Sequence, residues 1–486
     1  MRGAYPVESI RTAERRLMAA LPDPSGDALM HRAAAGLAAH AAALLGRVYG
    51  TEVAVLAGPG SNGGDALYAG ARLARRGARV TAYASADALH DGGAGDLRAA
   101  GGRIGADVPD RLRADLVLDG LLGIGGRPGL AGRARDLAAL TADARRRGAI
   151  VVAVDLPSGV DADTGWAPDD AGGPIEADVT VTFGALKPGL LIGPGRTAAG
   201  EVRLVDIGLG PVLPDPRILV LEAADVAALL PTPHAGSDKY TRGVVGVVAG
   251  SAQYGGAAVL ATGAALHGGA GMVRYAGPAR DAVRAAHPEV VVAPGDGPPT
   301  EAGQVQAWAA GPGMGVDDDA FARLADLLRT DEPLILDADA ITLIARAPAI
   351  VRGRRADTVL TPHDREFARV FGEVGSDRIG AARRAADDVG ATVLLKGDAT
   401  AVAGPDGRVY VNPTGTPWLA TAGSGDVLTG LIGALLAAGL PGPEAAAVGA
   451  YVHGLAGQIA AADGPPSARD IAAALRPALA SLTRSG

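Results

Sequence analysis

The sequence predicts two α/β domains in tandem, the first built on a doubly wound parallel sheet. The chain has 486 residues, more than one ordinary domain holds. Short apolar runs alternate with segments of helical spacing in both halves, which is the pattern of βαβ units. Glycine is abundant, with 72 residues, and much of it lies in loops between the apolar runs, where α/β folds turn from strand to helix.

The first half contains a regular series of apolar runs and helical segments. We expect strands at Glu52–Ala57, Arg79–Ala84, Asp115–Leu118, Ala149–Val154, Ala177–Phe183 and Glu201–Asp206. We expect helices at Asp27–Leu45, Ala66–Arg76 and Ala131–Arg147. Strands that are separated by helices pair in parallel, so this half predicts a doubly wound sheet with Asp27–Leu45 packed in front of it.

Gly208–Pro216 interrupts the series, because glycine and proline break both helix and strand. We therefore place the two domains at residues 1–212 and 213–486. Strands of the second are expected at Gly243–Ala249, Met272–Ala276, Val290–Ala293, Ala307–Ala310, Leu334–Leu336, Thr358–Leu360, Thr392–Leu395 and Ala399–Ala403. Its helices are expected at Gly255–Gly269, Gly425–Ala438 and Ala445–Ala462, the last two closing the domain.

Composition excludes several classes of function. The net charge is −8 and no long basic run exists, which argues against a nucleic-acid partner. Cysteine is absent, so no disulfide, thiolate nucleophile or cysteine-based metal site is possible. Met1–Ala20 lacks the apolar core of a signal peptide, and we find no stretch of about 18 residues apolar enough to span a membrane. We expect a cytoplasmic protein with no membrane partner.

A glycine-rich loop, Gly58–Asp65, follows the first expected strand and precedes a helix. Its backbone N–H groups and the positive end of the helix could together hold a phosphate or another anion. A plain tight turn would have the same composition, and the residues alone do not separate the two hypotheses. The loop matches neither the G-x-G-x-x-G pattern nor the Walker pattern.

Two more loops follow expected strand ends, Asp119–Gly126 and Asp155–Gly159. Ligands of open α/β sheets bind outside the carboxyl ends of the strands. One aspartate in such a place would more often shape a turn or cap a helix, but three such loops together favour a common site. The candidates are oxygen ligands without histidine or cysteine, so the pattern favours a hard cation such as Mg²⁺, Ca²⁺ or K⁺.

In the second half, Gly423-Ser424-Gly425-Asp426 stands directly before an apolar helix. Backbone N–H groups at a helix N-terminus can stabilise a transferring phosphoryl group, and an aspartate there can accept the proton of a substrate hydroxyl. Lys396–Thr400, between two expected strands, fits a nucleotide-binding turn, and Asn412–Gly415 precedes the helix by about ten residues. The alternative is that Gly423–Asp426 forms only an ordinary N-cap turn.

The motifs GPGSNGGD, DGLLGIGG, DLPSG and TFGALKPG resemble the N-terminal domain of the YjeF family, the Rossmann-like NAD(P)HX epimerases, over about residues 5–210. The resemblance implies that K⁺ is held by Asn62, Asp119 and Ser158. It implies contact with the hydrate for Ser61, Asn62, Gly63, Gly64, Asp65, Gly123, Ile124, Gly125, Gly126, Arg127, Pro128, Gly129 and Asp155. Lys187 would act in acid–base chemistry, the alternative being a surface lysine. Ser61 stands where the family usually has asparagine.

The second half resembles the ribokinase-like fold, and within it the ADP/ATP-dependent NAD(P)H-hydrate dehydratases, over about residues 235–480. Besides the loops above, the resemblance rests on Gly250-Ser251, Gly256–Ala258, Gly269–Gly271, Gly311–Gly313, Asp337–Ala340 and Thr361–His363. It implies Asp426 as catalytic base, an anion hole at Gly423, Ser424 and Gly425, and nucleotide contacts from Lys396, Gly397, Asp398, Ala399, Thr400 and Gly425. Hydrate contacts would come from Ala257, Gly313, His363 and Asp426. His363 alone would more often cap or pack. Asp364-Arg365 replaces the family's Pro-Gly.

Together the two resemblances imply a bifunctional repair enzyme for hydrated nicotinamide cofactors. The first domain would epimerise S- and R-NADHX and NADPHX with K⁺. The second would dehydrate the S form with ADP and Mg²⁺, ADP being the donor in bacterial members. Family members tend to form homo-oligomers. Two alternatives stay open: a ribokinase-like small-molecule kinase, and a first domain that binds nicotinamide nucleotides without catalysis.

Overall fold

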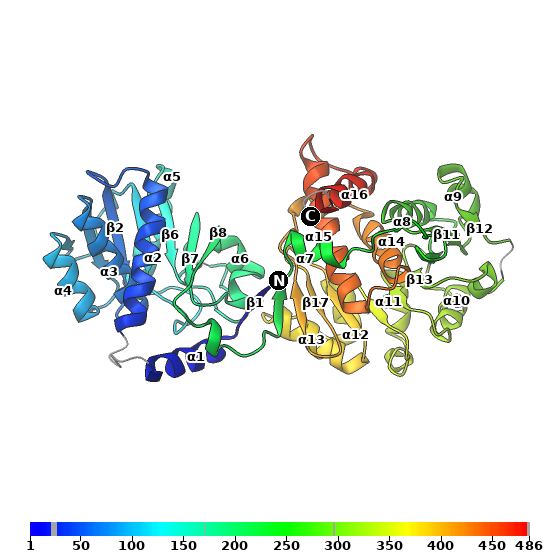
Figure 1. Ribbon diagram of the computed structural model, residues 1–486, viewed down its shortest axis with the longest axis horizontal. Helices are drawn as coiled ribbons and strands as arrows, with labels where there is room; N and C mark the ends of the chain where they lie inside the picture. The colour runs from blue at the N-terminus through cyan, green and yellow to red at the C-terminus, as the bar shows by residue number, and fades with distance from the viewer. Residues whose placement is uncertain (21–26, 171, 295–296, 484–486) are drawn as a thin grey trace. The chain divides into compact units, whose positions relative to one another are not determined.

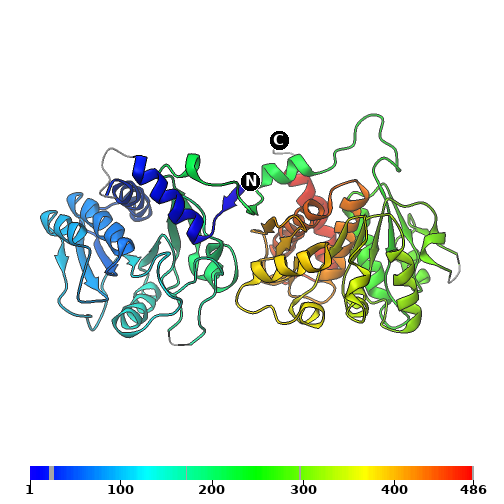
Figure 2. The same cartoon turned by 90° about the horizontal axis from the view of Figure 1, so that it is seen from below.

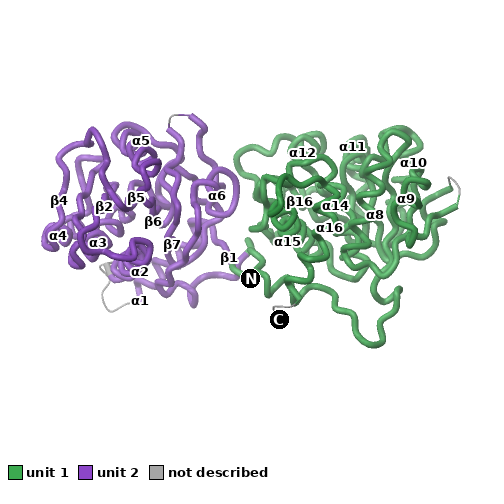
Figure 3. Tube along the Cα trace, turned by 90° about the horizontal axis from the view of Figure 1, so that it is seen from above, with its two compact units in different colours: residues 1–2, 217–486 green, residues 3–216 purple. Residues whose placement is uncertain are grey.

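A computed structural model describes residues 1–20, 27–170, 172–294 and 297–483 and shows two compact units (Figure 3). One comprises Gly3–Pro216 and the other Arg217–Gly486 together with Met1 and Arg2. The division therefore falls after residue 216 rather than after residue 212, because Leu209 is buried in the core of the first unit and Val212 and Leu213 pack against that core. Met1 and Arg2 join the second unit through ion pairs to Asp225 and Glu222.

The first unit contains a seven-stranded sheet in which every neighbouring pair is parallel. The strand order is β4-β3-β2-β5-β6-β7-β8, so the chain winds outward from β2 and then returns to add β5 on its other side. The strands are β2 (Glu52–Ala57), β3 (Arg79–Ala84), β4 (Arg103–Ile104), β5 (Leu116–Gly120), β6 (Ile150–Val154), β7 (Val179–Phe183) and β8 (Glu201–Val205). This confirms the predicted doubly wound sheet.

Helices cover both faces of this sheet (Figure 1). One face packs against α1 (Val7–Ala20), α2 (Asp27–Leu45), α3 (Ser61–Arg75) and α4 (Asp91–Ala99), whose apolar side chains share a cluster with Val53 and Val55. The opposite face, which carries Ala54 and Leu56, packs against α5 (Gly132–Arg146). Successive residues of β2 thus point into two different cores, which explains why the strand is apolar after Glu52. A short helix, α6 (Gly193–Ala199), precedes β8.

Helix α2 meets the length and composition criteria for a membrane span, over Ala28–Leu45 with a mean hydropathy of 1.2. The expectation that the chain has no such stretch was therefore wrong by these criteria. They are weak evidence here, because an apolar core helix near the N-terminus meets them too. In the structure α2 packs on α3, and its Ala34, Leu37 and Ala41 are fully buried in the core over the sheet.

The second unit contains a larger sheet in the order β1-β9-β18-β17-β16-β15-β14-β13-β10-β11-β12. Strands β10 (Val244–Val248), β11 (Met272–Tyr275), β12 (Val291–Val292), β13 (Ala307–Ala310), β14 (Leu334–Leu336), β15 (Thr358–Leu360) and β16 (Thr392–Leu395) pair in parallel. An antiparallel extension, β17 (Ala401–Ala403) and β18 (Val409–Val411), leads to the edge strands β9 (Ile218–Val220) and β1 (Arg2–Ala4).

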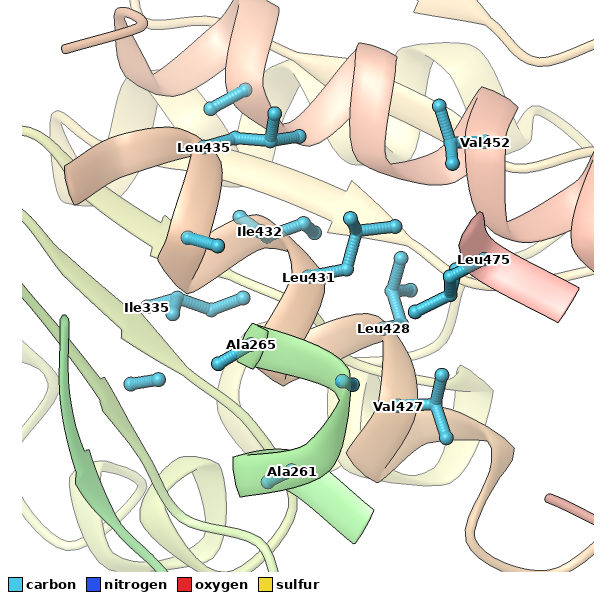
Figure 4. Packing of buried hydrophobic residues seen from close by; sticks show 14 of the residues in the cluster. Ala261, Ala265, Ile335, Val427, Leu428, Leu431, Ile432, Leu435, Val452 and Leu475 are labelled. Atoms are coloured by element: carbon cyan, nitrogen blue, oxygen red, sulfur yellow. The ribbon is translucent and has the colours of Figure 1, made fainter. Parts of the chain in front are cut away.

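One apolar cluster holds this unit together, with α14 (Ser424–Ala437) at its centre (Figure 4). Leu428, Leu431 and Leu435 of α14 are buried among α8 (Gly255–His267), α15 (Gly442–Ala461) and α16 (Ala468–Thr483). The remaining helices are α7 (Ala223–Leu229), α9 (Arg280–Ala286), α10 (Asp318–Leu328), α11 (Asp339–Ile344), α12 (Asp364–Phe371) and α13 (Arg378–Val389). Helix α13 packs on β16 and β17, and Figure 2 gives a second view of these layers.

Most of the predicted elements are present, and the differences have simple causes. Helix α3 begins at Ser61, so the second half of the glycine-rich segment is helical and not loop. Asp119 lies within β5 rather than after it. The prediction that α15 closes the domain was wrong, because α16 follows; Pro477 inside α16 interrupts the helical signal in the sequence. Strands β9 and β18 have three residues each, too few to show a period.

Gly430 allows the close approach of α14 to α8, because a Cβ there would overlap the carbonyl oxygen of Ala261. We expect Gly430→Ala to lower the free energy of unfolding of the second unit by about 1–3 kcal/mol. The matched control is Gly256→Ala on α8, where an added Cβ meets nothing within 4 Å; it should be neutral or stabilise by up to about 1 kcal/mol. Denaturant unfolding followed by the fluorescence of buried Trp308 measures both, and equal midpoints would contradict this account.

Candidate functional site

The first candidate site lies where β2 and β5 are neighbours, the point at which the chain reverses its direction across the first sheet. Asp119 is the next-to-last residue of β5 and is completely buried. It accepts hydrogen bonds from the backbone N–H of Ser158 at 2.9 Å and from the Ser158 hydroxyl at 2.6 Å. Burial raises the pKa of Asp119 to about 6, although these hydrogen bonds lower it. Two of the three side chains expected at a cation are thus in direct contact.

Asn62, in the first turn of α3, reaches the same place. A Cβ on Gly123 would lie 3.0 Å from the Asn62 amide oxygen, and a Cβ on Gly120 would lie 3.0 Å from its backbone oxygen. The Asn62 Nδ2 is buried without a hydrogen-bond partner among the described residues, which is costly unless a ligand completes the site. The amide, carboxylate and hydroxyl oxygens of Asn62, Asp119 and Ser158 form the kind of donor set that hard cations prefer.

Asp155 and Lys187 form a buried ion pair beside this point. Lys187 is 1% exposed, so the alternative of a surface lysine was wrong. Its ammonium group donates to Asp155 Oδ1 at 2.5 Å, to the Thr182 hydroxyl at 2.9 Å and to the Phe183 carbonyl at 3.0 Å. Asp155 has a positive φ of 67°, a conformation that a non-glycine residue adopts only when its surroundings impose it. The three hydrogen bonds of Lys187 fix where its charge lies.

Asp65 lies one turn after Asn62 on α3 and is buried, with its Oδ1 unpartnered in the protein. Burial raises the pKa of Asp65 well above the ordinary value, and the carboxylates of Asp155 and Glu14 raise it further. Glu14 comes from α1, a helix to which the sequence reasoning assigned no function. An unpartnered buried oxygen and a cluster of three carboxyl groups around one lysine are features of a ligand site rather than of a core.

The glycines of the first site are required by close packing. A Cβ on Gly63 would overlap the carbonyl oxygen of Gly58, and one on Gly64 would meet Met30 at 2.9 Å and His90 at 3.0 Å. Gly60 is the N-cap of α3 and provides no side-chain cap, so the first N–H groups of the helix remain available to an anion. Ser61 is exposed at the start of the helix. These facts favour the ligand-binding hypothesis over the plain turn.

The segment Gly123–Gly129 folds over the carboxyl end of β5. Gly126 donates to the carbonyl of Gly123 at 2.8 Å, and Gly129 donates to the carbonyl of Gly159 at 2.8 Å. Ile124 is partly buried and, like Val7 of α1, packs against the apolar cluster that includes Leu156 and Leu190, whereas Gly125 and Arg127 are exposed and Pro128 is partly buried. The segment therefore joins the loops after β5 and β6, as expected of residues that contact one ligand.

The second candidate site lies at the N-terminus of α14. Gly423 has a φ of 86°, and a Cβ there would meet Leu260 at 2.6 Å, so only glycine fits. Asp426 lies in the first turn of the helix. Burial raises the pKa of Asp426 to about 7; Asp337 and Asp339 also raise it, and Lys396 lowers it. An aspartate with a pKa near neutrality is suited to accept a proton at physiological pH.

Asp337, at the end of β14, is the centre of a polar network behind Asp426. It is 1% exposed and accepts hydrogen bonds from Lys396 Nζ at 2.7 Å and from the Thr429 hydroxyl at 2.8 Å. Lys396 also lies 3.7 Å from a carboxylate oxygen of Glu366. Burial lowers the pKa of Lys396, but the carboxylates of Asp337, Glu366 and Asp426 outweigh burial and raise it overall. The lysine is therefore charged and fixed in place.

The segment Lys396–Thr400 is the turn of an antiparallel hairpin between β16 and β17, as the sequence indicates. Gly397 and Asp398 are exposed and can be reached by a nucleotide, whereas Ala399 is completely buried. Arg378 supports the turn by donating to the carbonyl of Lys396 at 2.8 Å, and it also pairs with both carboxylate oxygens of Asp364. The Asp364 that departs from the family pattern thus stabilises the turn.

Two of the residues expected at the hydrate in this unit, Ala257 and Gly313, meet where β10 and β13 are neighbours. Gly313 has a φ of 59°, and a Cβ there would lie 3.0 Å from Cβ of Ala257. Gly250 donates to the carbonyl of Pro312 at 2.7 Å, which ties the loops after the two strands together. A Cβ on Gly425, at the start of α14, would be 3.5 Å from Lys396 Nζ. The anion hole and the lysine are therefore adjacent.

His363 is the N-cap of α12, the role that the alternative hypothesis gave it. Its Nδ1 accepts from the N–H groups of Arg365 at 3.1 Å and Glu366 at 3.3 Å, and Glu366 accepts from the His363 N–H at 2.9 Å. The imidazole is 50% exposed, with Nε2 3.4 Å from Glu366. Capping leaves its outer edge accessible, so contact with a substrate stays a prediction.

Sequence reasoning missed three residues of these sites as individual candidates, namely Glu14, Arg378 and Thr429. Glu14 and Arg378 are distant in sequence from the motifs, and Thr429, one turn after Asp426, is a single threonine in an apolar helix that no local pattern marks. Among the described ranges, no group of three or more His, Cys, Asp or Glu side chains is arranged to hold a metal. The cation set of the first unit has a different composition, with one carboxylate, one amide and one hydroxyl.

Comparison with known proteins agrees with this division of the chain. Residues 26–189 match the model of the YjeF-related protein N-terminus, and residues 245–475 match that of NAD(P)H-hydrate dehydratase. The bifunctional NAD(P)H-hydrate repair enzyme Nnr of Mycobacterium leprae is 50% identical over 493 residues, which cover 99% of this chain and 100% of that protein. The enzyme of the same name from Mycobacterium tuberculosis (strain CDC 1551) is 50% identical over 454 residues, 92% of each chain.

A solved structure adds the fold of the second unit. A ribokinase-like superfamily protein from Enterococcus faecalis is 26% identical, with a TM-score of 0.50, and the match covers 56% of this chain and 99% of that one. This likeness, the two family models and the full-length relatives agree with the resemblances drawn from the motifs. The chain belongs to the family of bifunctional NAD(P)H-hydrate repair enzymes.

Proposed function

We propose that this enzyme repairs hydrated nicotinamide cofactors in two steps. The first unit interconverts the R and S forms of NADHX and NADPHX. The second unit dehydrates the S form to NADH or NADPH with ADP, and releases AMP and phosphate. The observation that supports this most is Asp426, a carboxyl group with a pKa of about 7 at the open N-terminus of a buried helix. Family membership supports both activities on one chain.

In the second unit, Asp426 would accept the proton of the hydroxyl at C6 of the hydrate. The oxygen then attacks the terminal phosphorus of ADP, and the bond from that phosphorus to the bridging oxygen of AMP breaks. Hydroxide leaves poorly but phosphate leaves well, so loss of phosphate from C6 together with a proton from C5 restores the double bond of the reduced nicotinamide ring. The backbone N–H groups at Gly423, Ser424 and Gly425 would stabilise the charge on the phosphoryl group, and Lys396 adds positive charge beside them.

The nucleotide would lie along the hairpin turn Lys396–Thr400. Mg²⁺ commonly binds nucleotide phosphates together with one or two carboxylates, and Asp337 and Asp339 are the carboxylates whose charges raise the pKa of Asp426. When bound, it would neutralise charge on the phosphates. Asp337 holds Lys396 and Thr429 in place, so the protein contributes an ordered charge pattern before any ligand arrives.

In the first unit, Asn62, Asp119 and Ser158 would hold K⁺, which would orient oxygen atoms of the substrate. The N-terminus of α3 would bind phosphate groups of the cofactor. Lys187 and Asp155 would act on the hydrated ring. They form an ion pair with each other, and the charges of both act on the carboxyl group of Asp65. The buried polar atoms of Asn62 and Asp65 without partners support a ligand-completed site over a module without chemistry. A small-molecule kinase would leave this first site without a function, and the family match does not favour it.

The decisive experiment mixes the protein with NADHX, Mg²⁺ and ADP and follows the absorbance of the reduced nicotinamide. We expect absorbance to recover, with AMP and phosphate formed in equal amounts. Asp426→Asn should reduce this rate by about 10²–10⁴-fold, because it removes the base. The rate should fall as the pH drops below about 7, since Asp426 is then protonated and cannot accept a proton. Folded wild-type protein that restores nothing with ADP or ATP would refute the proposal.

The proposed cation site predicts that epimerisation depends on K⁺ and that dehydration does not. Conversion of R- to S-NADHX, measured by chromatography, should require K⁺, and Asp119→Ala should abolish both the rate and its K⁺ dependence because the one charged ligand is lost. Dehydration of S-NADHX by the same variant should be unchanged, which controls for folding of the second unit. Epimerisation at the wild-type rate in Asp119→Ala would favour a first unit that only binds.

The Asp364–Arg378 ion pair predicts an effect on nucleotide binding. Asp364→Asn weakens the bidentate pair that positions Arg378 against the Lys396 carbonyl, so the turn should lose order. We expect the KM for ADP to rise by about 3–10-fold, the size expected when a hydrogen bond to a charged group is weakened, with kcat nearly unchanged. The control is Asp388→Asn, which weakens an exposed ion pair to Arg352. An unchanged KM would show that the pair does not support the turn.

A further inference from the structure

The side chain of Ser424, in the motif that begins α14, contacts a neighbouring helix. Ser424 is the first residue of α14 and is 4% exposed. Its hydroxyl lies 3.3 Å from Nε2 of His453, a residue of α15 that is 5% exposed. Asp426, the proposed base, lies two residues further along the same helical turn. A contact at the first residue of α14 therefore helps to decide where the N-terminus of the helix and this carboxyl group lie.

The imidazole of His453 is neutral at physiological pH. Burial lowers the pKa of His453 to about 4; a hydrogen bond with the backbone of Ser424 raises it, and the charge of Lys396 lowers it. A neutral imidazole has one nitrogen that donates and one that accepts, so it can form a directed contact. It does so without placing a second positive charge near Lys396.

The same part of α15 also holds the loop that Asn412 begins, to which the proposed mechanism gives no role. Asn412 Nδ2 donates to the carbonyl of Ala450 at 3.0 Å, and the Thr414 hydroxyl donates to the carbonyl of Tyr451 at 2.8 Å. These two carbonyl groups lie in the turn of α15 that precedes His453. One turn of α15 therefore supports two of the motifs that the sequence singles out in this unit.

The alternative is a histidine that only fills space between helices. His267 of α8 is such a residue, because its Nδ1 lies 2.8 Å from the carbonyl of Ala472 in α16, away from the motifs. His453 differs, since its ring contacts a residue of the proposed phosphoryl-binding motif. An aliphatic side chain could fill the same space without the cost of burying a polar ring. The contact with Ser424 gives the buried ring a purpose that packing does not.

We infer that His453 is a positioning residue for phosphoryl transfer: it holds Ser424, so that the N-terminus of α14 and Asp426 keep their places at the terminal phosphate of the nucleotide. The inference rests on the proposed dehydratase function and adds a residue to it. His453 acts through Ser424 and not on a reacting atom. Displacing a catalytic group by about 1 Å can lower a rate by about 10²-fold, so a contact that fixes this turn matters for turnover.

The test compares His453→Asn with His453→Gln in the full chain, with S-NADHX, Mg²⁺ and ADP. The amide of glutamine reaches the position of Nε2, whereas the amide of asparagine reaches only that of Nδ1, so only glutamine can keep the contact with Ser424. His453→Asn should lower kcat for dehydration by about 10–10²-fold with little change in the KM for ADP. His453→Gln should stay within about 3-fold of the wild-type kcat, because it keeps the hydrogen bond.

Two controls accompany this comparison. His267→Asn, which keeps the reach of Nδ1 toward the Ala472 carbonyl, should dehydrate S-NADHX at the wild-type rate. A double-mutant cycle with Ser424→Ala shows whether His453 acts through Ser424. If it does, His453→Asn should change kcat by less than about 3-fold once the Ser424 hydroxyl is absent, since the two losses are then not additive.

Four outcomes would overturn the inference. They are an unchanged kcat in folded His453→Asn, a loss confined to KM, equal losses in His453→Asn and His453→Gln, and additive losses in the cycle. If His453→Asn does not fold, Ser424→Ala still decides, because it removes the other partner of the contact; an unchanged kcat there would overturn the inference as well. Failure of the proposed function is distinguishable, because the wild-type protein would then not restore NADH from S-NADHX at all.

Discussion

Charged side chains buried at the carboxyl edge of a parallel sheet are the constraint on which both sites depend. In each unit a lysine holds an aspartate there: Lys187 holds Asp155, and Lys396 holds Asp337. Removing one partner of such a pair leaves an uncompensated charge, at a typical cost of about 3–5 kcal/mol. The surrounding loops must therefore supply polar contacts, and they do so through the Thr182 and Thr429 hydroxyls. The polar side chains that stabilise these buried pairs are then also available to bind and act on a ligand.

Parallel strands explain why these groups meet. All strands of the first sheet end at one edge, so residues that lie far apart in the chain, such as Asn62, Asp119 and Ser158, are brought to one point. The helices that follow the strands begin at the same edge, and their N-termini bring positive potential to it. Where the strand order reverses, the two neighbouring loops diverge and leave room for a ligand. The second sheet repeats this arrangement between β10 and β13, with α14 supplying the N-terminus.

Glycine and alanine make the close approach of these elements possible. Gly63 lies against the backbone of Gly58, and Gly430 lies against that of Ala261; in both places any side chain would overlap a carbonyl group. With 3% aromatic residues, the cores are formed by small and branched aliphatic side chains, which allows helices such as α8 and α14 to pack closely. Stability and site geometry are coupled, because α14 is both the centre of the core and the support of Asp426.

The sequence by itself determined the α/β class, the two units, the long strands and the residues within the motifs. These features are local: residues 53–57 of β2 are apolar because both faces of the strand are buried, and the GSGD loop is glycine-rich because Gly423 has a positive φ. The roles assigned to most motif residues remain predictions. Only the tertiary structure showed that Lys187 is buried and not on the surface, that His363 caps α12, and that Arg378 supports the Lys396 turn. Such facts depend on contacts between elements distant in the chain, and no local pattern of residues encodes those contacts.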